Sequence, residues 1–194
     1  MLNYIKNQIQ ASYETKQKIL VNEELLNIIQ TVAQKCVELY RGDAKTMLAG
    51  NGGSAADAQH IAAELVGRYG FDRPSLSSIA LTTDTSNLTA IGNDYGYDQV
   101  FSRQVEGVGR EGDILFGIST SGNSQNIINA FEAAKKKNIM TVALVGRDGG
   151  KMGTMADYAI IIPSNDTPRI QESHILVGHI ICDIIEKEIF AKGV

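Results

Sequence analysis

The chain has 194 residues, a hydrophobic content of 43% and a charged content of 21%, the composition of one globular domain with a sizeable core. The formal net charge is -4, and the basic cluster, residues 135–137, lies near the end of a helical pattern, which argues against a nucleic-acid partner. The N-terminus lacks a signal-peptide apolar region and no apolar run approaches about 18 residues, so we expect a cytoplasmic protein with no membrane partner.

The first 40 residues are predicted to be helical throughout. Apolar residues recur at spacings of three and four in two stretches, and Asn22 is placed to cap the second helix. Because both helices precede the first predicted strand, they form an N-terminal addition to the sheet. They either cover the sheet or provide an interface with a partner, and the sequence leaves both possibilities open.

After residue 40 the pattern changes to short apolar runs that alternate with helical patterns. This alternation indicates an α/β fold, a three-layer sandwich with a five-stranded parallel sheet. We expect a single domain over residues 1–194, with an N-terminal helical extension (1–40) and a C-terminal helix (169–192). The predicted strands are 46–50, 76–81, 113–118, 140–146 and 158–163, and the predicted intervening helices are 54–68, 86–92, 99–106 and 124–137.

Cys36 and Cys182 each lie in an apolar, helix-like stretch, and neither has a CxxC partner. We therefore expect two buried thiols of a reducing compartment, not a disulfide or a thiolate metal site.

Two strands end in similar small polar turns that open a helix. TMLAG is followed by NGGS, and ILFGI is followed by STSGNS. Since ligands of parallel sheets bind beyond the carboxyl ends of the strands, both turns are candidates for one site. The STSGNS turn offers hydroxyls and the free N–H groups of a helix start, which suits a phosphate. It lacks the pattern of a nucleotide P-loop, so a sugar phosphate is favoured. The alternative is a simple N-cap.

His60 and Glu64 share a helix face because they are four residues apart. Such a pair can bind a metal or serve as acid and base, although a local pair near solvent is the simpler interpretation. In the last helix, His174 and His179 are about 140° apart around the axis, so both cannot face one ligand. Spacing alone does not choose between them. His179 is expected to be buried, and Gln171 as a second inward polar residue favours a site.

Three further polar segments follow predicted helices or strands. The run 91–96 (IGNDYG) is expected to break a helix, either as a C-cap or as a loop that reaches sugar hydroxyls. Asp84 follows the second strand and is placed to line the cleft. Residues 147–153 (RDGGKMG) are expected to form a flexible turn without chemistry.

Together, AGNGGS with H-x-x-x-E, IGND, STSGNS and RIQE followed by His179 resemble the bacterial phosphoheptose isomerase family, a branch of the sugar-isomerase (SIS) domain proteins. The resemblance covers nearly the whole chain and implies the flavodoxin-like SIS fold. It implies conversion of sedoheptulose 7-phosphate to D-glycero-D-manno-heptose 7-phosphate, the entry step to activated heptoses of lipopolysaccharide, capsule or other surface glycans. It also implies a homotetramer with sites at subunit interfaces and one zinc ion per site.

The resemblance also implies residue roles. The zinc ligands would be His60, Glu64, Gln171 and His179, which selects His179 over His174; glutamine is an uncommon zinc ligand. One departure is Thr167-Pro168, where some relatives have an acidic residue before RIQE. The implied substrate contacts are Asn51, Gly52, Gly53, Glu64, Asn93, Asp94, Ser119, Thr120, Ser121, Ser124 and Gln171.

A ketose-to-aldose isomerisation through an enediol needs one base and one acid. Our hypothesis is that Glu64 removes the C1 proton and that His179 serves as the acid/base at the substrate oxygens, with zinc as a Lewis acid. The alternatives are a non-catalytic tetrameric SIS scaffold that binds a replication initiator protein, a sugar-phosphate sensor, and an isomerase of the arabinose 5-phosphate type.

Overall fold

The computed structural model describes residues 1–191, and it confirms the predicted three-layer α/β architecture with a five-stranded sheet. All neighbouring strands are parallel, in the order β2-β1-β3-β4-β5. The strands are β1 (Thr46–Gly50), β2 (Ser78–Ala80), β3 (Ile114–Ser119), β4 (Met140–Gly146) and β5 (Tyr158–Ile162).

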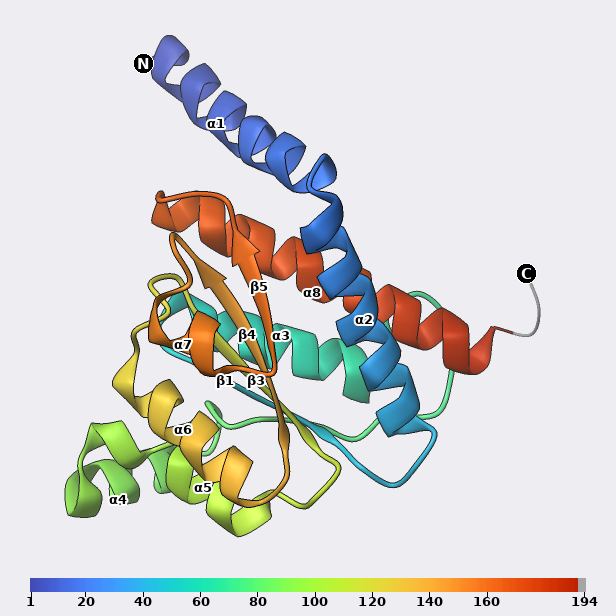
Figure 1. Ribbon diagram of the computed structural model, residues 1–194, viewed down its shortest axis with the longest axis vertical. Coiled ribbons are helices and arrows are strands. Elements are labelled where there is room, and N and C mark those ends of the chain that lie inside the picture. The colour runs from blue at the N-terminus through green and yellow to red at the C-terminus, as the bar shows by residue number, and fades with distance from the viewer. Residues whose placement is uncertain (192–194) are drawn as a thin grey trace.

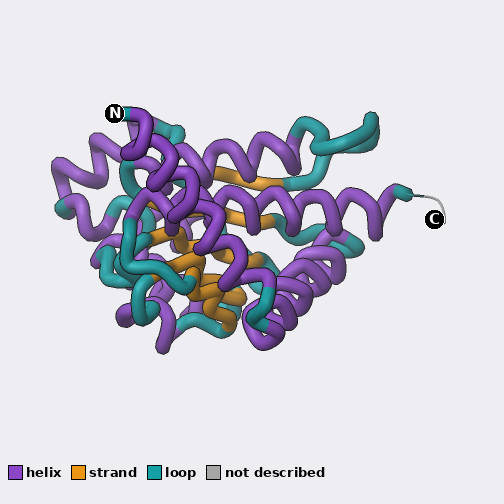
Figure 2. The backbone as a smooth tube through the Cα atoms, turned by 90° about the horizontal axis from the view of Figure 1, so that it is seen from above, coloured by secondary structure: helices purple, strands orange, loops and turns teal. Residues whose placement is uncertain are grey.

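Helices cover both faces of the sheet, as Figures 1 and 2 show. Alternate strand residues point to opposite faces, so Leu48 and Phe116 belong to one apolar core and Met47 and Leu115 to the other. The first core includes side chains of α2 (Glu23–Tyr40), α3 (Gly53–Val66) and α8 (Thr167–Phe190). The second includes side chains of α5 (Ser102–Val108), α6 (Gln125–Lys136) and α7 (Gly150–Met155).

The chain reverses its direction of travel across the sheet at β1. It leaves β1 for β2 on one side and then crosses to β3 on the other, so β1 and β3 flank a topological switch point. Gly50 at the end of β1 is paired with Ile118 near the end of β3. The NGGS and STSGNS turns therefore emerge side by side where open parallel sheets bind ligands.

The two N-terminal helices have different roles. Helix α2 covers the sheet, and its N-cap, Asn22, accepts a hydrogen bond from the Leu25 N–H at 3.0 Å, as predicted. Helix α1 (Leu2–Leu20) extends away from the body (Figure 1) and buries only Thr15 and Ile19. The Arg169 guanidinium of α8 holds α1 by donating to the Gln8 carbonyl at 2.7 Å.

Several predicted boundaries differ from the structure. Helix α4 (Thr85–Tyr95) is longer than predicted: the Asp84 side chain caps its start by accepting from the Asn87 N–H at 3.0 Å, and the helix continues through Gly92 to Tyr95. Of the two alternatives predicted for 91–96, the loop was therefore wrong, and the C-cap is confirmed at Gly96. A short 3-10 helix, η1 (Tyr97–Gln99), follows. The strand predicted over 76–81 is shorter, and the predicted turn 147–153 includes the start of α7. The C-terminal helix ends at Phe190, and residue 192 lies outside the described part.

Cys36 and Cys182 are both buried and unpaired, as predicted. Burial raises the pKa of both thiols, so they remain protonated and are poor metal ligands. Among residues 1–191, no helix is both long enough and apolar enough to cross a membrane.

The packing of β3 against α6 yields a first prediction. A Cβ atom at Gly117 would lie 2.6 Å from Ile127 Cγ2 and from Phe131 Cζ, both in the closed core. Gly117→Ala should therefore lower the free energy of unfolding by about 1–3 kcal/mol, measured by urea denaturation. Gly107→Ala is the matched control, because a Cβ atom there meets open space. Equal stability of the two variants would contradict this packing.

Candidate active site

The turn after β1 is held by an amide pair that links it to the helix after β3. Asn51 donates from Nδ2 to Asn126 Oδ1 at 3.0 Å, and Asn126 returns the bond to Asn51 Oδ1 at 2.9 Å. The Tyr97 hydroxyl also donates to Asn51 Oδ1, at 3.2 Å. Asn126 is buried and was not predicted, because an asparagine in the first turn of a helix resembles ordinary N-terminal chemistry.

The STSGNS turn is shaped by contacts other than capping bonds. Ser124 is the N-cap of α6 but makes no side-chain capping bond, and its hydroxyl instead lies 2.8 Å from that of Ser119. Residues 147–153, which were predicted to be a flexible turn, donate two backbone hydrogen bonds to this loop. The Met152 N–H donates to the Gly122 carbonyl at 2.9 Å, and the Lys151 N–H donates to Asn123 Oδ1 at 3.1 Å. Residues 147–153 therefore help to hold the shape of the STSGNS loop.

Helices α3 and α8 lie side by side on the same face of the sheet and are in contact along their length (Figure 1). At the start of α3, a Cβ atom on Gly53 would lie 2.5 Å from Gln171 Nε2. Further along, a Cβ atom on Gly178 would lie 2.6 Å from Ile61 Cδ1. The two helices are therefore close along this seam, and residues from each can share one ligand.

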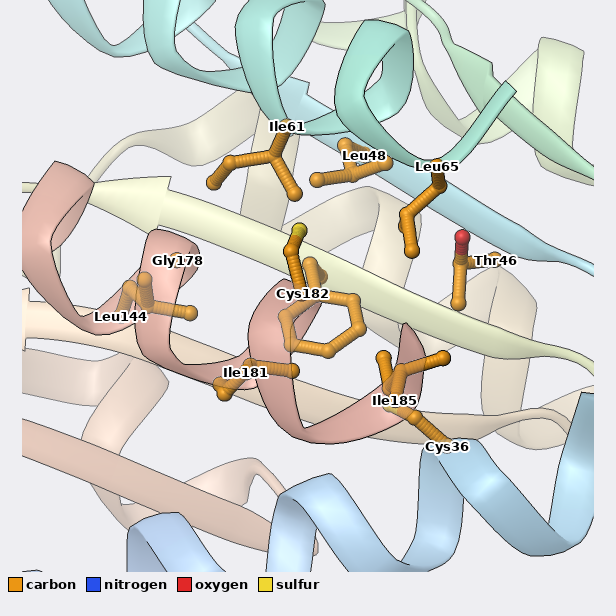
Figure 3. Close-up of a pocket in the computed structure, with 11 residues that line it drawn as sticks. Cys36, Thr46, Leu48, Ile61, Leu65, Leu144, Gly178, Ile181, Cys182 and Ile185 are labelled. Atoms are coloured by element: carbon orange, nitrogen blue, oxygen red, sulfur yellow. The ribbon is translucent and has the colours of Figure 1, made fainter. Parts of the chain in front are cut away.

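Beneath this seam the contact is apolar. A small pocket is lined by Ile61 and Leu65 of α3 and by Gly178 and Cys182 of α8, together with side chains from the sheet and α2 (Figure 3). The apolar layer fixes the separation of the helices and leaves their polar residues at the outer rim.

At that rim the structure brings together three of the predicted residues. The Nε2 atoms of His60 and His179 are 2.9 Å apart, and their ring centroids are 5.0 Å apart. His60 Nε2 is also 3.1 Å from Glu64 Oε1. One ligand atom from each residue can be chosen so that all three lie within 4.8 Å of one another. The predicted pairing of α3 with His179 is therefore present in the fold.

The chemistry of this cluster fits a zinc ion. Two imidazoles and one carboxylate are a common catalytic zinc set and leave a fourth position for another ligand. Two imidazole nitrogens that face each other need either a shared proton or a cation between them, and a divalent cation satisfies both nitrogens. The cluster is partly exposed, so a substrate can reach it.

The two histidines of α8 lie in different environments. His174 is completely buried, whereas His179 is only partly buried, so the prediction of a buried His179 was wrong. The reason is that Gly178 occupies the helix-helix contact, and its neighbour His179 lies on the flank towards His60. Within residues 1–191, neither ring nitrogen of His174 has a hydrogen-bond partner of good geometry; burial lowers its pKa to about 4, and the nearby Val145 backbone only partly opposes this.

Not all predicted residues lie in this cluster. The Gln171 side chain lies against Gly53, at the NGGS end of the seam. Asn93 and Asp94 lie on the exposed helix α4, where the Asn93 amide donates to Asp94 Oδ1 at 2.8 Å. Among residues 1–191, no hydrogen bond links either of them to α3, α8 or the STSGNS turn.

Comparisons with known proteins agree with the overall fold. A family model described as a SIS domain matches residues 11–146. The chain is 75% identical to the phosphoheptose isomerase of Sulfurimonas denitrificans over the full length of both chains. Among solved structures, the phosphoheptose isomerase of Neisseria gonorrhoeae has a TM-score of 0.90 at 46% identity, covering 96% of this chain and 98% of that one. The enzyme of Francisella tularensis has a TM-score of 0.92 at 36% identity, with the same coverage.

The buried His174 leads to a prediction about pH. Its pKa is about 4 in the folded state, against an ordinary value of 6.5, so the unfolded chain binds the extra proton first as pH falls. Stability is therefore lost between about pH 6.5 and pH 4, by about 3 kcal/mol in total. His174→Gln should show a flatter dependence of unfolding free energy on pH in this window, measured by urea denaturation with a chelator present. Parallel curves for the two proteins would contradict the assignment.

Proposed function

The chain belongs to the SIS-domain phosphoheptose isomerase family, and from that premise we propose that it converts sedoheptulose 7-phosphate to D-glycero-D-manno-heptose 7-phosphate. The observation that carries this proposal is the cluster of His60, Glu64 and His179 on a seam that begins at the NGGS turn. The proposed phosphate loop and the proposed acid/base cluster would then hold opposite ends of the substrate. The product would supply activated heptose for a bacterial surface glycan, made in the cytoplasm.

The STSGNS turn is the proposed phosphate site. The hydroxyls of Ser119, Thr120, Ser121 and Ser124 and the free N–H groups at the start of α6 donate to phosphate oxygens, and the helix dipole favours their negative charge. Among these, the Ser119–Ser124 hydroxyl contact is a local bond that a phosphate can replace. The proposed sugar contacts are Asn51, Gly52, Gly53, Asn93, Asp94 and Gln171.

The spacing along α3 supports a long substrate. From Gly53 to His60 the helix advances by about 10 Å, or two turns. A phosphate anchored beyond the NGGS turn therefore leaves room for an extended sugar chain before its far end reaches Glu64. This remote anchoring positions the reacting carbons, and it suits a seven-carbon chain better than a three- or four-carbon one.

In the proposed reaction Glu64 removes a proton from C1 of the open-chain ketose and returns it to C2. His179 moves a proton between the oxygens on these two carbons, so that the carbonyl ends at C1. Glu64 Oε1 faces His60, and its second carboxylate oxygen remains for the substrate. A zinc ion held by His60, Glu64 and His179, one per subunit, would polarise the substrate oxygens when bound. The predicted fourth ligand, Gln171, would have to turn towards this cluster from its contact with Gly53.

We also propose that the protein is a homotetramer with sites at subunit interfaces. Helix α1 extends from the body with an exposed apolar stripe, in which Ile5 is 49% and Ile9 is 66% exposed. Such a stripe favours contact with another copy of the chain. Asn93 and Asp94, exposed on α4, would then serve the site of a neighbouring subunit.

A direct assay tests the proposed reaction. Purified protein is incubated with sedoheptulose 7-phosphate, and product is followed by NMR with and without a chelator. Glu64→Gln should retain substrate binding but lose turnover by about 100-fold to 10,000-fold, because the variant lacks the base. Glu132→Gln, an exposed change on α6, is the control and should retain turnover.

Two outcomes of this assay would contradict the proposal. Full turnover by Glu64→Gln would remove Glu64 as the base. No product from the unmodified protein under any metal condition would instead favour a scaffold or a sugar-phosphate sensor.

The proposed assembly is tested by changing the apolar and the polar positions of helix α1 separately. The double change Ile5→Ser and Ile9→Ser removes the apolar stripe, and sedimentation should show a smaller assembly with lower activity. The control double change Lys6→Ser and Gln10→Ser alters exposed polar positions of the same helix and should keep the assembly. Equal masses for both variants would argue against assembly through this stripe.

A further inference from the structure

A buried carboxylate on α8 organises the chain that follows α3. Glu186 is 1% exposed, and its Oε2 accepts from the Tyr69 N–H at 2.8 Å. Its Oε1 accepts from the N–H groups of Gly70 at 2.5 Å and Phe71 at 3.1 Å. Burial by itself would raise the pKa of Glu186, but these bonds and Arg73 outweigh it and hold the pKa below its usual range. The carboxylate thus remains charged and fixes three successive residues.

Arg73 completes this network and extends it to the end of α3. Its Nε donates to Glu186 Oε2 at 2.9 Å, with both side chains 1% exposed. Its Nη2 donates to the Glu64 carbonyl at 2.8 Å, and its Nη1 donates to the Leu65 carbonyl at 2.7 Å. Arg73 therefore satisfies carbonyls in the last turn of α3, which have no partner within the helix.

This network contacts the segments that carry both proposed reacting residues, Glu64 and His179. One acceptor is the backbone of Glu64 itself. Glu186 is about two turns beyond His179 on α8, so both lie on the same side of that helix. The loop that Glu186 fixes carries Tyr69, whose ring centroid is 5.8 Å from that of His179, with a tilt of 46°. A movement of this network would therefore displace Glu64 and His179 relative to each other.

We propose that Arg73 and Glu186 are positioning residues for the reacting end of the cleft. They fix the end of α3 that carries Glu64, and the loop that carries Tyr69, relative to α8 and His179. This inference rests on the proposed function, since it assigns the pair to the same site. Their effect is on the geometry of Glu64 and His179, and they do not themselves touch the substrate.

If Arg73 and Glu186 only stabilised the fold, their loss would lower stability without a specific effect on kcat or zinc affinity. A second buried carboxylate, Asp113, provides the matched control. Asp113 is also a buried carboxylate, and it accepts from the N–H groups of Lys45 at 3.0 Å and Arg110 at 2.8 Å and from the Lys45 ammonium. It precedes β3, at the amino end of the strands, and so lies at the edge of the sheet opposite the site. Asp113→Asn therefore removes a similar network far from Glu64 and His179.

The test compares Glu186→Gln with Asp113→Asn under conditions where both are folded, as judged by circular dichroism. We expect both to unfold at lower urea concentration than the unmodified protein. Only Glu186→Gln should lower kcat, by tenfold or more, with KM for sedoheptulose 7-phosphate changed less than threefold, because the phosphate end is intact. Only Glu186→Gln should also weaken zinc binding by tenfold or more, measured by competition with a chelator in the absence of substrate.

Equal kcat and equal zinc affinity in the two variants would overturn the positioning role and leave the proposed function intact. Failure of the unmodified protein to convert the substrate would overturn the proposed function, whereas the zinc comparison would still test the positioning role. If Glu186→Gln does not fold, Arg73→Lys replaces it, because lysine keeps the charge but lacks the planar set of donors that reaches Glu186 and both carbonyls. Unchanged kcat and zinc affinity in Arg73→Lys would likewise overturn the proposal.

Discussion

The close packing of α3 against α8 is the constraint on which the rest of this site depends. Each helix alone carries an incomplete set of groups, with His60 and Glu64 on one and His179 on the other. Contact between Gly178 and Ile61 brings the helices together, and the histidine nitrogens then meet at 2.9 Å. The apolar layer beneath supplies the packing energy, because it excludes water from side chains of both helices. The polar cluster is thus a consequence of apolar packing.

The topology of the sheet positions the two polar turns of the site. Because β1 and β3 flank the switch point, the NGGS and STSGNS turns are adjacent, and the Asn51–Asn126 pair joins them. The seam between α3 and α8 starts at the NGGS turn, where Gln171 lies against Gly53. The proposed phosphate loop therefore lies next to the NGGS turn, and the cluster of His60, Glu64 and His179 lies further along α3.

Sequence patterns predicted most of the fold and those site residues that lie close together in the sequence. The bounds of β1 and β4 were predicted correctly, since each is a mostly apolar run that ends in glycine. His60 and Glu64 could be paired because i, i+4 geometry is contained in one helix. The end of helix α4 was placed too early because Gly92 suggested a break, although the helix continues through Gly92 to a C-cap at Gly96.

The remaining features depend on tertiary contacts that no local pattern contains. Periodicity could not choose between His174 and His179, and the choice came from a family resemblance; packing against Ile61 decides which imidazole reaches the rim. Asn126 and Glu186 resemble ordinary helix residues, yet their partners lie far away in the chain. The most direct test of the shared site is zinc K-edge X-ray absorption of the zinc-loaded protein. We predict two imidazole ligands at about 2.0–2.1 Å, further oxygen donors and no sulfur. A sulfur ligand, or a spectrum without imidazole, would contradict the assembly of one site by α3 and α8.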